Sequence, residues 1–214
     1  MSSASAPLRL VSNPSPPTVI GKVAPPTRKP NKEIRSREYL TSQEVDKIMA
    51  EARRRGRHGH RDATMILLAY RHGLRVSELV DLRWDQIDWK GYIHVQRLKN
   101  GNDSTQPMEG DEIRALRRLK RENPESSFIF TTERKGPLTA STFRKLIAKA
   151  GELVNADLPR PIHPHMLRHG CGFYLANKNI DTRTIQDWLG HRNIQHTVRY
   201  TQLNGDRFKG LWRE

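Results

Sequence analysis

The sequence predicts a mainly helical domain that carries one small antiparallel β-sheet. Most of the chain after residue 40 has apolar residues at helical spacing, with capping residues where the periodic segments begin. One region, 91–108, instead has two extended segments around an Asn-Gly turn, which is typical of a β-hairpin. Residues 1–38 show neither pattern, so we expect the folded domain to comprise residues 39–214.

The N-terminal 38 residues are predicted to form a disordered basic tail. They contain seven of the thirteen prolines, many serines and almost no periodic apolar pattern. Residues 1–40 carry a net charge of +5, which leaves +10 for residues 41–214. The tail is either a solvated leader or an arm that contacts DNA phosphates, and its composition leaves both interpretations open.

The charge of the whole chain indicates a polyanionic partner. The formal net charge is +15 and the pI is about 10.4, so nucleic acid is the first candidate and an anionic membrane surface the second. The sequence shows no apolar run that could span a bilayer and no signal-peptide pattern. The single cysteine, Cys171, fits a reducing compartment and a buried packing position. We therefore expect a cytoplasmic protein.

The first half of the domain is predicted to be helical. Thr41 to Glu44 (TSQE) is a capping box that opens a helix through about Ala52. The segment 63–73 is apolar nearly all round, so it should be a helix at the centre of the core. A short helix is expected within residues 74–89, with Arg75 at its start.

The hairpin and two further helices are expected in the middle of the chain. Pro107 lacks the N–H that a ladder needs, so the second strand of the hairpin should lie at an edge. The expected elements are strands at 91–96 and 104–108 around a turn at 99–103, a helix over 109–123, a short strand over 127–131, and a helix over 138–154 capped by Thr139.

The stretch 163–201 contains five histidines, several arginines and two tyrosines, Tyr174 and Tyr200, within three expected short helices. Asp181 and Gly190 suit the N-cap and the C-terminal stop of the second of these helices. His165 and Arg168 stand three residues apart, so both project from one face of the first. A basic pair, an imidazole and a phenol held on packed helices could bind a phosphodiester and attack it.

Cleavage of DNA without a metal ion requires four kinds of group. Cations must bind the phosphate, a nucleophile must attack in line, a base must take its proton, and an acid must protonate the leaving oxygen. Arg75 and Arg168 are candidates for the phosphate clamp, because planar guanidinium groups bind phosphate oxygens bidentately. Lys99, at the hairpin tip, is the candidate acid, and Tyr200 is the candidate nucleophile.

The order of these residues resembles the tyrosine recombinases, the phage integrase family. The matching motifs are LRVSEL at 74–79, HMLRH at 165–169, LGH at 189–191 and Tyr200 nine residues later. The runs HPHMLRH, IDTRTIQD, LGHRNI and RFKGLW are more similar to the small fimbrial phase-variation recombinases, which invert a promoter segment. The resemblance covers residues 40–214. It implies the catalytic-domain fold of the tyrosine recombinases and site-specific recombination, by inversion or by integration and excision.

The resemblance assigns each matching residue a role in cutting and rejoining a DNA strand. These roles are phosphate binding for Arg75 and Arg168, a phosphate hydrogen bond for His191, exchange of the tyrosine proton for His165, protonation of the leaving 5′ oxygen for Lys99, and a 3′-phosphotyrosyl bond for Tyr200. Glu78 resembles an acidic residue that supports the site. Lys90 and Arg97 lie on or near the same hairpin as Lys99 and stay alternatives for the acid. Strand transfer conserves bond energy, so the resemblance implies no metal or nucleotide cofactor.

The resemblance also implies partners. They are double-stranded DNA, further copies of the chain in a synaptic multimer (a tetramer), and, as an open option, DNA-bending accessory proteins at the bacterial nucleoid. Apolar residues at i, i+3 and i+4 near the C-terminus would dock on a neighbouring subunit: Phe208, Leu211 and Trp212. Typical integrases carry a separate N-terminal core-binding domain, and here only the Pro-rich tail stands in that place.

Other interpretations of the same residues predict different proteins. An idle DNA-binding regulator could share the fold, and a relaxing enzyme of the type IB topoisomerase kind could share the chemistry. His165 and His169 have a zinc-like i, i+4 spacing, but no HExxH glutamate or cysteine pair accompanies them, so no metal site is expected. His169 and His196 are expected to pack in the core or to support the site. The other tyrosines are expected to be packing residues: Tyr39, Tyr70, Tyr92 and Tyr174.

Overall fold

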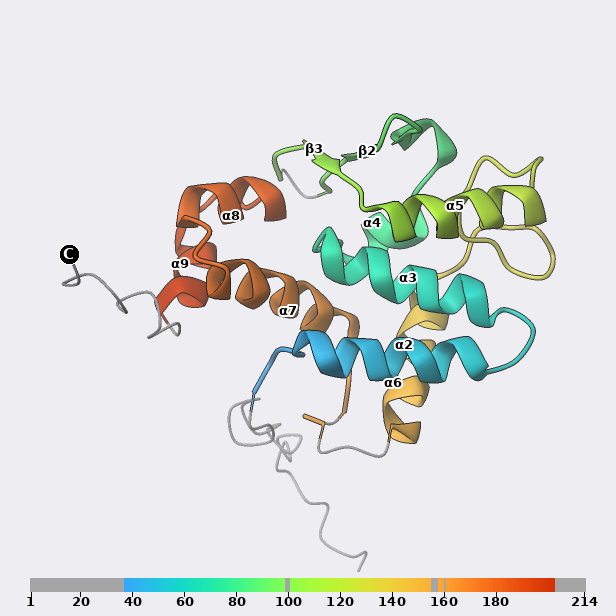
Figure 1. Cartoon of the computed structure of the whole chain (residues 1–214), viewed down its shortest axis with the longest axis horizontal. Helices are drawn as coiled ribbons and strands as arrows, with labels where there is room; N and C mark the ends of the chain where they lie inside the picture. The colour runs from blue at the N-terminus through green and yellow to red at the C-terminus, as the bar shows by residue number, and fades with distance from the viewer. Residues whose placement is uncertain (1–36, 99–100, 155–157, 160, 203–214) are drawn as a thin grey trace, which may run out of the picture. The chain divides into compact units, whose positions relative to one another are not determined.

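The computed structural model describes residues 37–98, 101–154, 158–159 and 161–202, which belong to one compact unit spanning Arg35–Glu214 (Figure 1). Its helices are α2 (Ser42–Arg54), α3 (Gly59–Arg71), α4 (Val76–Val80), α5 (Gly110–Glu122), α6 (Ala140–Leu153), α7 (Pro164–Asn177), α8 (Thr182–Leu189) and α9 (Gln195–Gln202), with a 3₁₀ turn at Trp84–Gln86. The strands are β1 (Ile87–Asp88), β2 (Tyr92–Val95) and β3 (Ser104–Pro107). The predicted fold class, mainly helical with a small antiparallel sheet, is confirmed.

Helix α2 begins at the predicted capping box. The Thr41 side chain accepts a hydrogen bond from the Glu44 N–H at 3.4 Å, and the Glu44 carboxylate accepts one from the Thr41 N–H at 2.8 Å. Arg37 forms an ion pair with the same carboxylate. The box satisfies two N–H groups that the first turn leaves without helical partners, so the start of α2 is fixed by local sequence.

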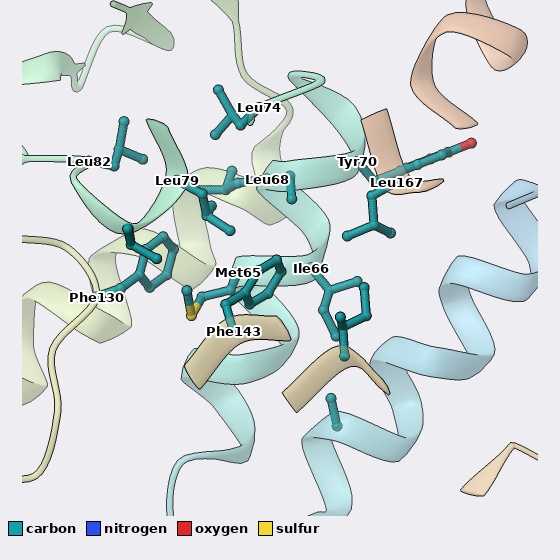
Figure 2. Packing of buried hydrophobic residues seen from close by; sticks show 14 of the residues in the cluster. Met65, Ile66, Leu68, Tyr70, Leu74, Leu79, Leu82, Phe130, Phe143 and Leu167 are labelled. Atoms are coloured by element: carbon teal, nitrogen blue, oxygen red, sulfur yellow. The ribbon is translucent and has the colours of Figure 1, made fainter. Parts of the chain in front are cut away.

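Helix α3 lies at the centre of the main core, as its apolar sequence predicts (Figure 2). It packs against α2, α5 and α7. Met65, Ile66 and Leu68 on α3 have no exposed surface, and the burial of apolar surface on this scale is the main stabilising term of a domain. The helix begins four residues earlier than predicted, at Gly59, so the basic turn after α2 is short.

The sheet has the strand order β1-β2-β3, and both pairings are antiparallel. Pro107 lies in β3, the edge strand, opposite Tyr92, which confirms its predicted edge position. The two-residue strand β1 was not predicted, because two residues cannot display an alternating pattern. The prediction of a strand over 127–131 is wrong. Only single bridges form there, Arg83 with Phe128 and Thr131 with Pro137, so the apolar run packs into the core as a loop.

The three C-terminal helices carry a second, smaller core cluster made of Cys171, Ala176, Ile185, Leu189 and Tyr200. The Asp181 carboxylate accepts hydrogen bonds from the Arg183 and Thr184 N–H groups at 2.9 and 3.0 Å, which confirms the predicted N-cap of α8. Gly190 ends α8 with φ of 65°, a left-handed conformation that favours glycine.

Several predicted side-chain positions can be compared with the structure. Cys171 is buried, as expected of a packing residue, and burial raises the pKa of its thiol to about 12. Tyr70 is buried too, and the rings of Tyr39 and Tyr174 pack against those of Phe173 and Tyr70. Tyr92 exposes 45% of its surface, so the prediction that it packs is wrong. None of the helices in the described ranges is long and apolar enough to cross a membrane. Lys99 and the C-terminal apolar residues Phe208, Leu211 and Trp212 lie outside the described residues.

Candidate active site

Arg75 lies at the N-cap of α4, where Glu78 holds it from two sides. One carboxylate oxygen of Glu78 accepts from the Arg75 guanidinium at 2.7 Å, and the other accepts from the Arg75 backbone N–H at 2.8 Å. The three-residue spacing between Arg75 and Glu78 produces this arrangement, because residue N3 of a helix faces back towards the N-cap. Glu78 is buried, which suits the role expected from the sequence, in which it supports Arg75.

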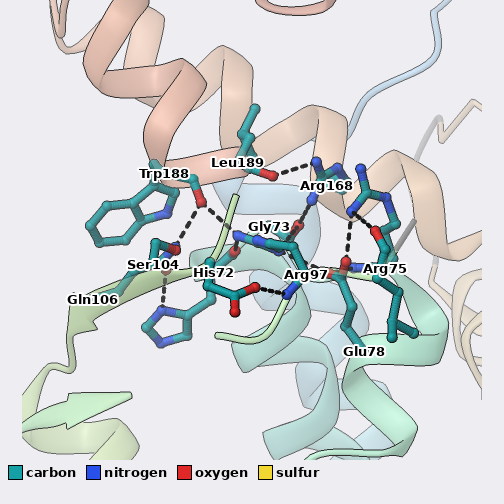
Figure 3. A network of polar contacts seen from close by, with 12 residues as sticks. His72, Gly73, Arg75, Glu78, Arg97, Ser104, Gln106, Arg168, Trp188 and Leu189 are labelled. Carbon is teal, nitrogen blue, oxygen red and sulfur yellow. Dashed lines mark hydrogen bonds and ion pairs between the residues drawn. The ribbon is translucent and has the colours of Figure 1, made fainter. Parts of the chain in front are cut away.

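Arg97, next to the hairpin turn, lies behind this pair (Figure 3). Its side chain has no exposed surface and donates to Glu78 at 2.9 Å, to the His72 carbonyl at 3.0 Å and to the Trp188 carbonyl at 2.6 Å. Burial alone would raise the pKa of Glu78, but Arg97 and Arg75 hold it below its ordinary value. Arg97 is therefore a buried structural cation, which makes it unsuited to donate a proton to a leaving group in this conformation.

Arg168 projects from α7 and is 3% exposed. Its guanidinium donates to the carbonyls of Gly73 and Leu189, the latter at 2.6 Å, so it connects the end of α3 to the end of α8 (Figure 3). Burial, followed by the charges of Arg97 and Arg75, lowers the pKa of Arg168 to about 9. The group still carries its charge at neutral pH, and a bound anion would stabilise that charge.

A pocket of about 290 Å³ opens beside these arginines. Its lining is strongly basic, and within the described residues it contains no carboxylate. The lining residues are Arg75, Gly101, His165, Arg168, His169, Gly190, His191, Arg192, Asn193, His196 and Arg199. A concave surface lined by fixed donors and positive charge is suited to a phosphate group.

Tyr200 lies next to this pocket on α9 and is 1% exposed. Its hydroxyl is 2.8 Å from His169 Nδ1 and 3.1 Å from the Arg199 guanidinium. Gly172 makes room for the ring, since a Cβ at that position would come within 2.7 Å of it. Burial raises the pKa of Tyr200, and Arg199 opposes the rise.

Comparison with known proteins identifies the family to which this site belongs. Residues 38–207 match the phage integrase family. The chain belongs to this family. It is 45% identical over 183 residues to the type 1 fimbriae regulatory protein FimE of Escherichia coli (strain K12), a match that covers 82% of this chain and 91% of FimE. The resemblance to fimbrial members of the family is thereby confirmed, and the chain is a site-specific DNA recombinase.

Two solved structures of integrase-family proteins have the same fold. The XerA recombinase superposes with a TM-score of 0.68 at 24% identity, over 79% of this chain and 61% of that one. A lambda integrase dimer bound to a COC′ core site superposes with a TM-score of 0.61 at 25% identity, over 82% of this chain and 50% of that one. This chain therefore spans between half and two thirds of those longer recombinases, and the shared part has the tyrosine recombinase catalytic-domain fold.

The structure of this integrase-family chain brings four of the six candidate residues to one pocket: Arg75, His165, Arg168 and His191. Tyr200 lies beside them, and Lys99 is outside the described residues. His191 is held through its Nδ1 by the Thr197 hydroxyl at 2.9 Å, and burial, followed by Arg168, lowers its pKa to about 3. A neutral His191 can donate or accept one further hydrogen bond with its other ring nitrogen.

Sequence reasoning missed Arg199 and left the places of two other residues open. His169 was expected to pack or to support the site, and it contacts the Tyr200 hydroxyl directly. Arg199 contacts the same hydroxyl. Arg97 was an alternative for the acid, and it is instead a buried partner of Glu78. The helical period could have identified His169. This residue follows Arg168 and lies four positions after His165, so it falls on the helix face that His165 and Arg168 share. No local signal identified Arg97, since its partners lie far along the chain.

Proposed function

We propose that this recombinase cuts and rejoins double-stranded DNA through a covalent 3′-phosphotyrosyl bond to Tyr200. The observation that supports it best is the juxtaposition of a basic, carboxylate-free pocket with a tyrosine hydroxyl held by hydrogen bonds. The two clamp arginines are fixed by Glu78 and by backbone carbonyls before any ligand binds. Donors that are already in place stabilise transition-state charge without reorganisation, which is the largest single contribution in many enzymes.

In the proposed reaction, Arg75 and Arg168 bind the non-bridging oxygens of the scissile phosphate. The Tyr200 oxygen attacks phosphorus, a Tyr–O–P bond forms, and the bond to the 5′ oxygen breaks. The leaving 5′ oxygen takes a proton from Lys99, and the tyrosine proton is exchanged through His165. His191 adds a hydrogen bond to the phosphate. Rejoining reverses each step with a different 5′ hydroxyl, so the proposed cycle needs neither a metal ion nor a nucleotide.

The biological outcome that we propose is inversion of a DNA segment by a multimer of this chain. The similarity to a fimbriae regulatory protein over nearly its whole length supports a switch of the phase-variation type, and a lambda integrase dimer bound to its core site supports assembly on DNA. The C-terminal residues Phe208, Leu211 and Trp212 are proposed to dock on a neighbouring subunit. Residues 1–38 are proposed to add non-specific affinity at the nucleoid, so their deletion should weaken binding to all duplexes alike.

A covalent-trapping experiment tests the proposal. Wild type, Tyr200→Phe and Tyr174→Phe are incubated with host DNA, and protein–DNA adducts are mapped after denaturation. Tyr174 is a suitable control because it lies on α7 and is 44% exposed. We expect adducts with wild type and Tyr174→Phe and none with Tyr200→Phe, whose DNA binding should be nearly intact. Adducts that persist in Tyr200→Phe would contradict the proposed nucleophile, and relaxation without a specific site would favour topoisomerase chemistry.

A further inference from the structure

The hydroxyl of Tyr200 has two neighbours that determine where its proton goes. His169 Nδ1 lies 2.8 Å from the phenol oxygen, and the Arg199 guanidinium lies 3.1 Å from it. The same guanidinium nitrogen lies 2.9 Å from His169 Nδ1. The three side chains come from α7 and α9 and form a closed set of contacts at the reacting oxygen.

The chemistry of arginine fixes the direction of one of these hydrogen bonds. A guanidinium only donates, so the phenol oxygen accepts from Arg199. The same Arg199 nitrogen lies 2.9 Å from Nδ1 and 3.3 Å from Nε2 of His169, so this contact does not select a tautomer. Because the phenol oxygen already accepts from Arg199, its own hydrogen can be donated to His169 Nδ1, which suits the neutral tautomer with hydrogen on Nε2. Before any substrate arrives, the tyrosine proton is already shared with a nitrogen base.

We propose that His169 is the direct acceptor of the Tyr200 proton during strand cleavage, and that Arg199 stabilises the phenolate charge that develops. The inference rests on the proposed function of Tyr200 as nucleophile. As the Tyr–O–P bond forms and the bond to the 5′ oxygen breaks, the proton moves from the phenol oxygen to His169 Nδ1. On rejoining, a 5′ hydroxyl attacks phosphorus and gives its proton to Lys99, the Tyr–O–P bond breaks, and His169 returns its proton to the phenolate.

This assignment gives His165 a more distant role. The ring of His165 is centred 5.9 Å from that of His169, and His169 forms the hydrogen bond with the Tyr200 hydroxyl. His165 is exposed and lines the phosphate pocket. It is therefore placed to exchange a proton with His169 or with solvent in a second step, after the phenol proton has left the oxygen.

The charges around His169 should make its basicity depend on whether a substrate phosphate is bound. Burial lowers the pKa of His169 to about 3, and the charges of Arg199, His165, Arg168 and His163 add to this effect. In the absence of DNA the imidazole is neutral at physiological pH, so its lone pair is available. A phosphate in the pocket offsets the positive charge of Arg168 and Arg199, which raises the basicity of His169 when substrate is bound.

The same contacts allow an opposite interpretation, in which the hydrogen bond with His169 holds the Tyr200 hydroxyl in an inactive position. The two interpretations predict changes of opposite sign when His169 is replaced. If His169 is the base, its replacement slows cleavage. If His169 holds Tyr200 in an inactive position, its replacement speeds cleavage. Asparagine separates basicity from hydrogen bonding, because its side-chain oxygen can accept from the phenol but does not bind a proton in the physiological range.

The test measures single-turnover adduct formation by full-length wild type, His169→Asn, His169→Gln and His165→Asn from about pH 6 to about pH 9. The substrate is a duplex recombination site with sulfur in place of the bridging 5′ oxygen, which removes the need for an acid. His94→Asn is the matched control. His94 lies on β2, its ring is 2.9 Å from the Thr105 hydroxyl, and it does not line the pocket. DNA binding and thermal unfolding show which variants are folded.

We expect both His169 variants to form adducts roughly 10²–10⁴-fold more slowly than wild type, with the deficit shrinking as pH rises and the phenol ionises by itself. His165→Asn should lose less, and His94→Asn should be unchanged. A faster reaction, or an asparagine variant with the rate and pH profile of wild type, would overturn the assignment of His169. Adducts formed by Tyr200→Phe would instead refute the proposed function.

Discussion

Two basic concavities of this recombinase contrast in how their charges are held. One is the pocket of the candidate active site. The other, here called the distal groove, is a hollow of about 750 Å³ lined by Arg53, Arg57, His58, His60, Arg61, Arg114, Arg118, Arg121 and Lys135 together with Asp111, Glu122 and Glu133. Figure 1 shows the α2–α3 turn and the end of α5, which line the groove, at the opposite end of the domain from α8 and α9.

The distal groove has at least as many cations as the pocket, but most of them are exposed. The side chain of Arg61, which is 13% exposed and donates to the Thr131 carbonyl at 2.7 Å, is an exception. Arg118 pairs with Glu122 at 2.9 Å while 58% of the Arg118 side chain is exposed, and Arg57 stands 3.8 Å from Glu133. Such pairs contribute about 0–1 kcal/mol and hold the side chains loosely. In the pocket, Arg168 is buried against backbone carbonyls. The contrast predicts that rigid donors, rather than the number of charges, distinguish a catalytic phosphate site from a merely basic surface.

The largest expected effect comes from removal of a rigid donor. Arg168→Ala should slow strand cleavage by roughly 10³-fold or more, because it removes transition-state charge stabilisation of several kcal/mol. Single-turnover cleavage of a duplex recombination site measures this loss. Arg168→Lys keeps the charge but loses the planar fork and should also be slow, while Arg118→Ala in the distal groove serves as the control. Equal losses in Arg168→Ala and Arg118→Ala would remove the distinction between the two regions.

The second effect is a loss of stability when the buried cation Arg97 is removed. Arg97→Met leaves the buried Glu78 carboxylate with Arg75 as its remaining cation and removes a donor from each of three backbone carbonyls. We expect the free energy of unfolding to fall by about 3 kcal/mol, as is typical when one partner of a buried ion pair is removed. Chemical denaturation checks this value. Arg118→Met, which breaks an exposed pair, should change the same quantity by less than about 0.5 kcal/mol.

The pH dependence of stability should show the same contrast. The folded protein holds the pKa of Glu78 below its ordinary value of 4.5. The ionised carboxylate therefore stabilises the fold above that value, and the contribution is lost as pH falls through the lower folded pKa. Glu78→Gln should be less stable than wild type near neutral pH, and the gap should narrow in acid. A gap that stays constant from neutral to acidic pH would show that the ionised carboxylate is not what stabilises the fold.

The smallest effect is expected from the distal groove. Arg118→Glu should change DNA affinity by less than about threefold at moderate salt, because exposed charges far from the phosphate pocket are screened. The slope of log affinity against log salt should stay the same. A slope reduced by roughly 0.9 would mean that Arg118 contacts a DNA phosphate. In that case the exposed groove would be part of the DNA interface despite its loosely held charges.

The sequence by itself determined the local features of this protein. The capping box at Thr41, the Asp181 N-cap, the Gly190 stop and the edge position of Pro107 each depend on residues that are near neighbours in the chain or on the covalent geometry of one residue. The spacing of His165 and Arg168 also required only the helical period. The order of LRVSEL, HMLRH, LGH and Tyr200 along the chain is characteristic of the family, and it does not depend on knowledge of the fold.

Only the tertiary structure decided how charges and protons are arranged. Arg97 reaches Glu78 and Trp188, 19 and 91 residues away, and His169 meets Tyr200 across 31 residues. Local spacing carries no information about such partners, because they come together through the packing of α7 against α3 and α9. Burial then changes what each group does: it makes Arg97 a structural cation and keeps His169 neutral. Desolvation depends on the whole fold, so no single stretch of sequence could reveal it.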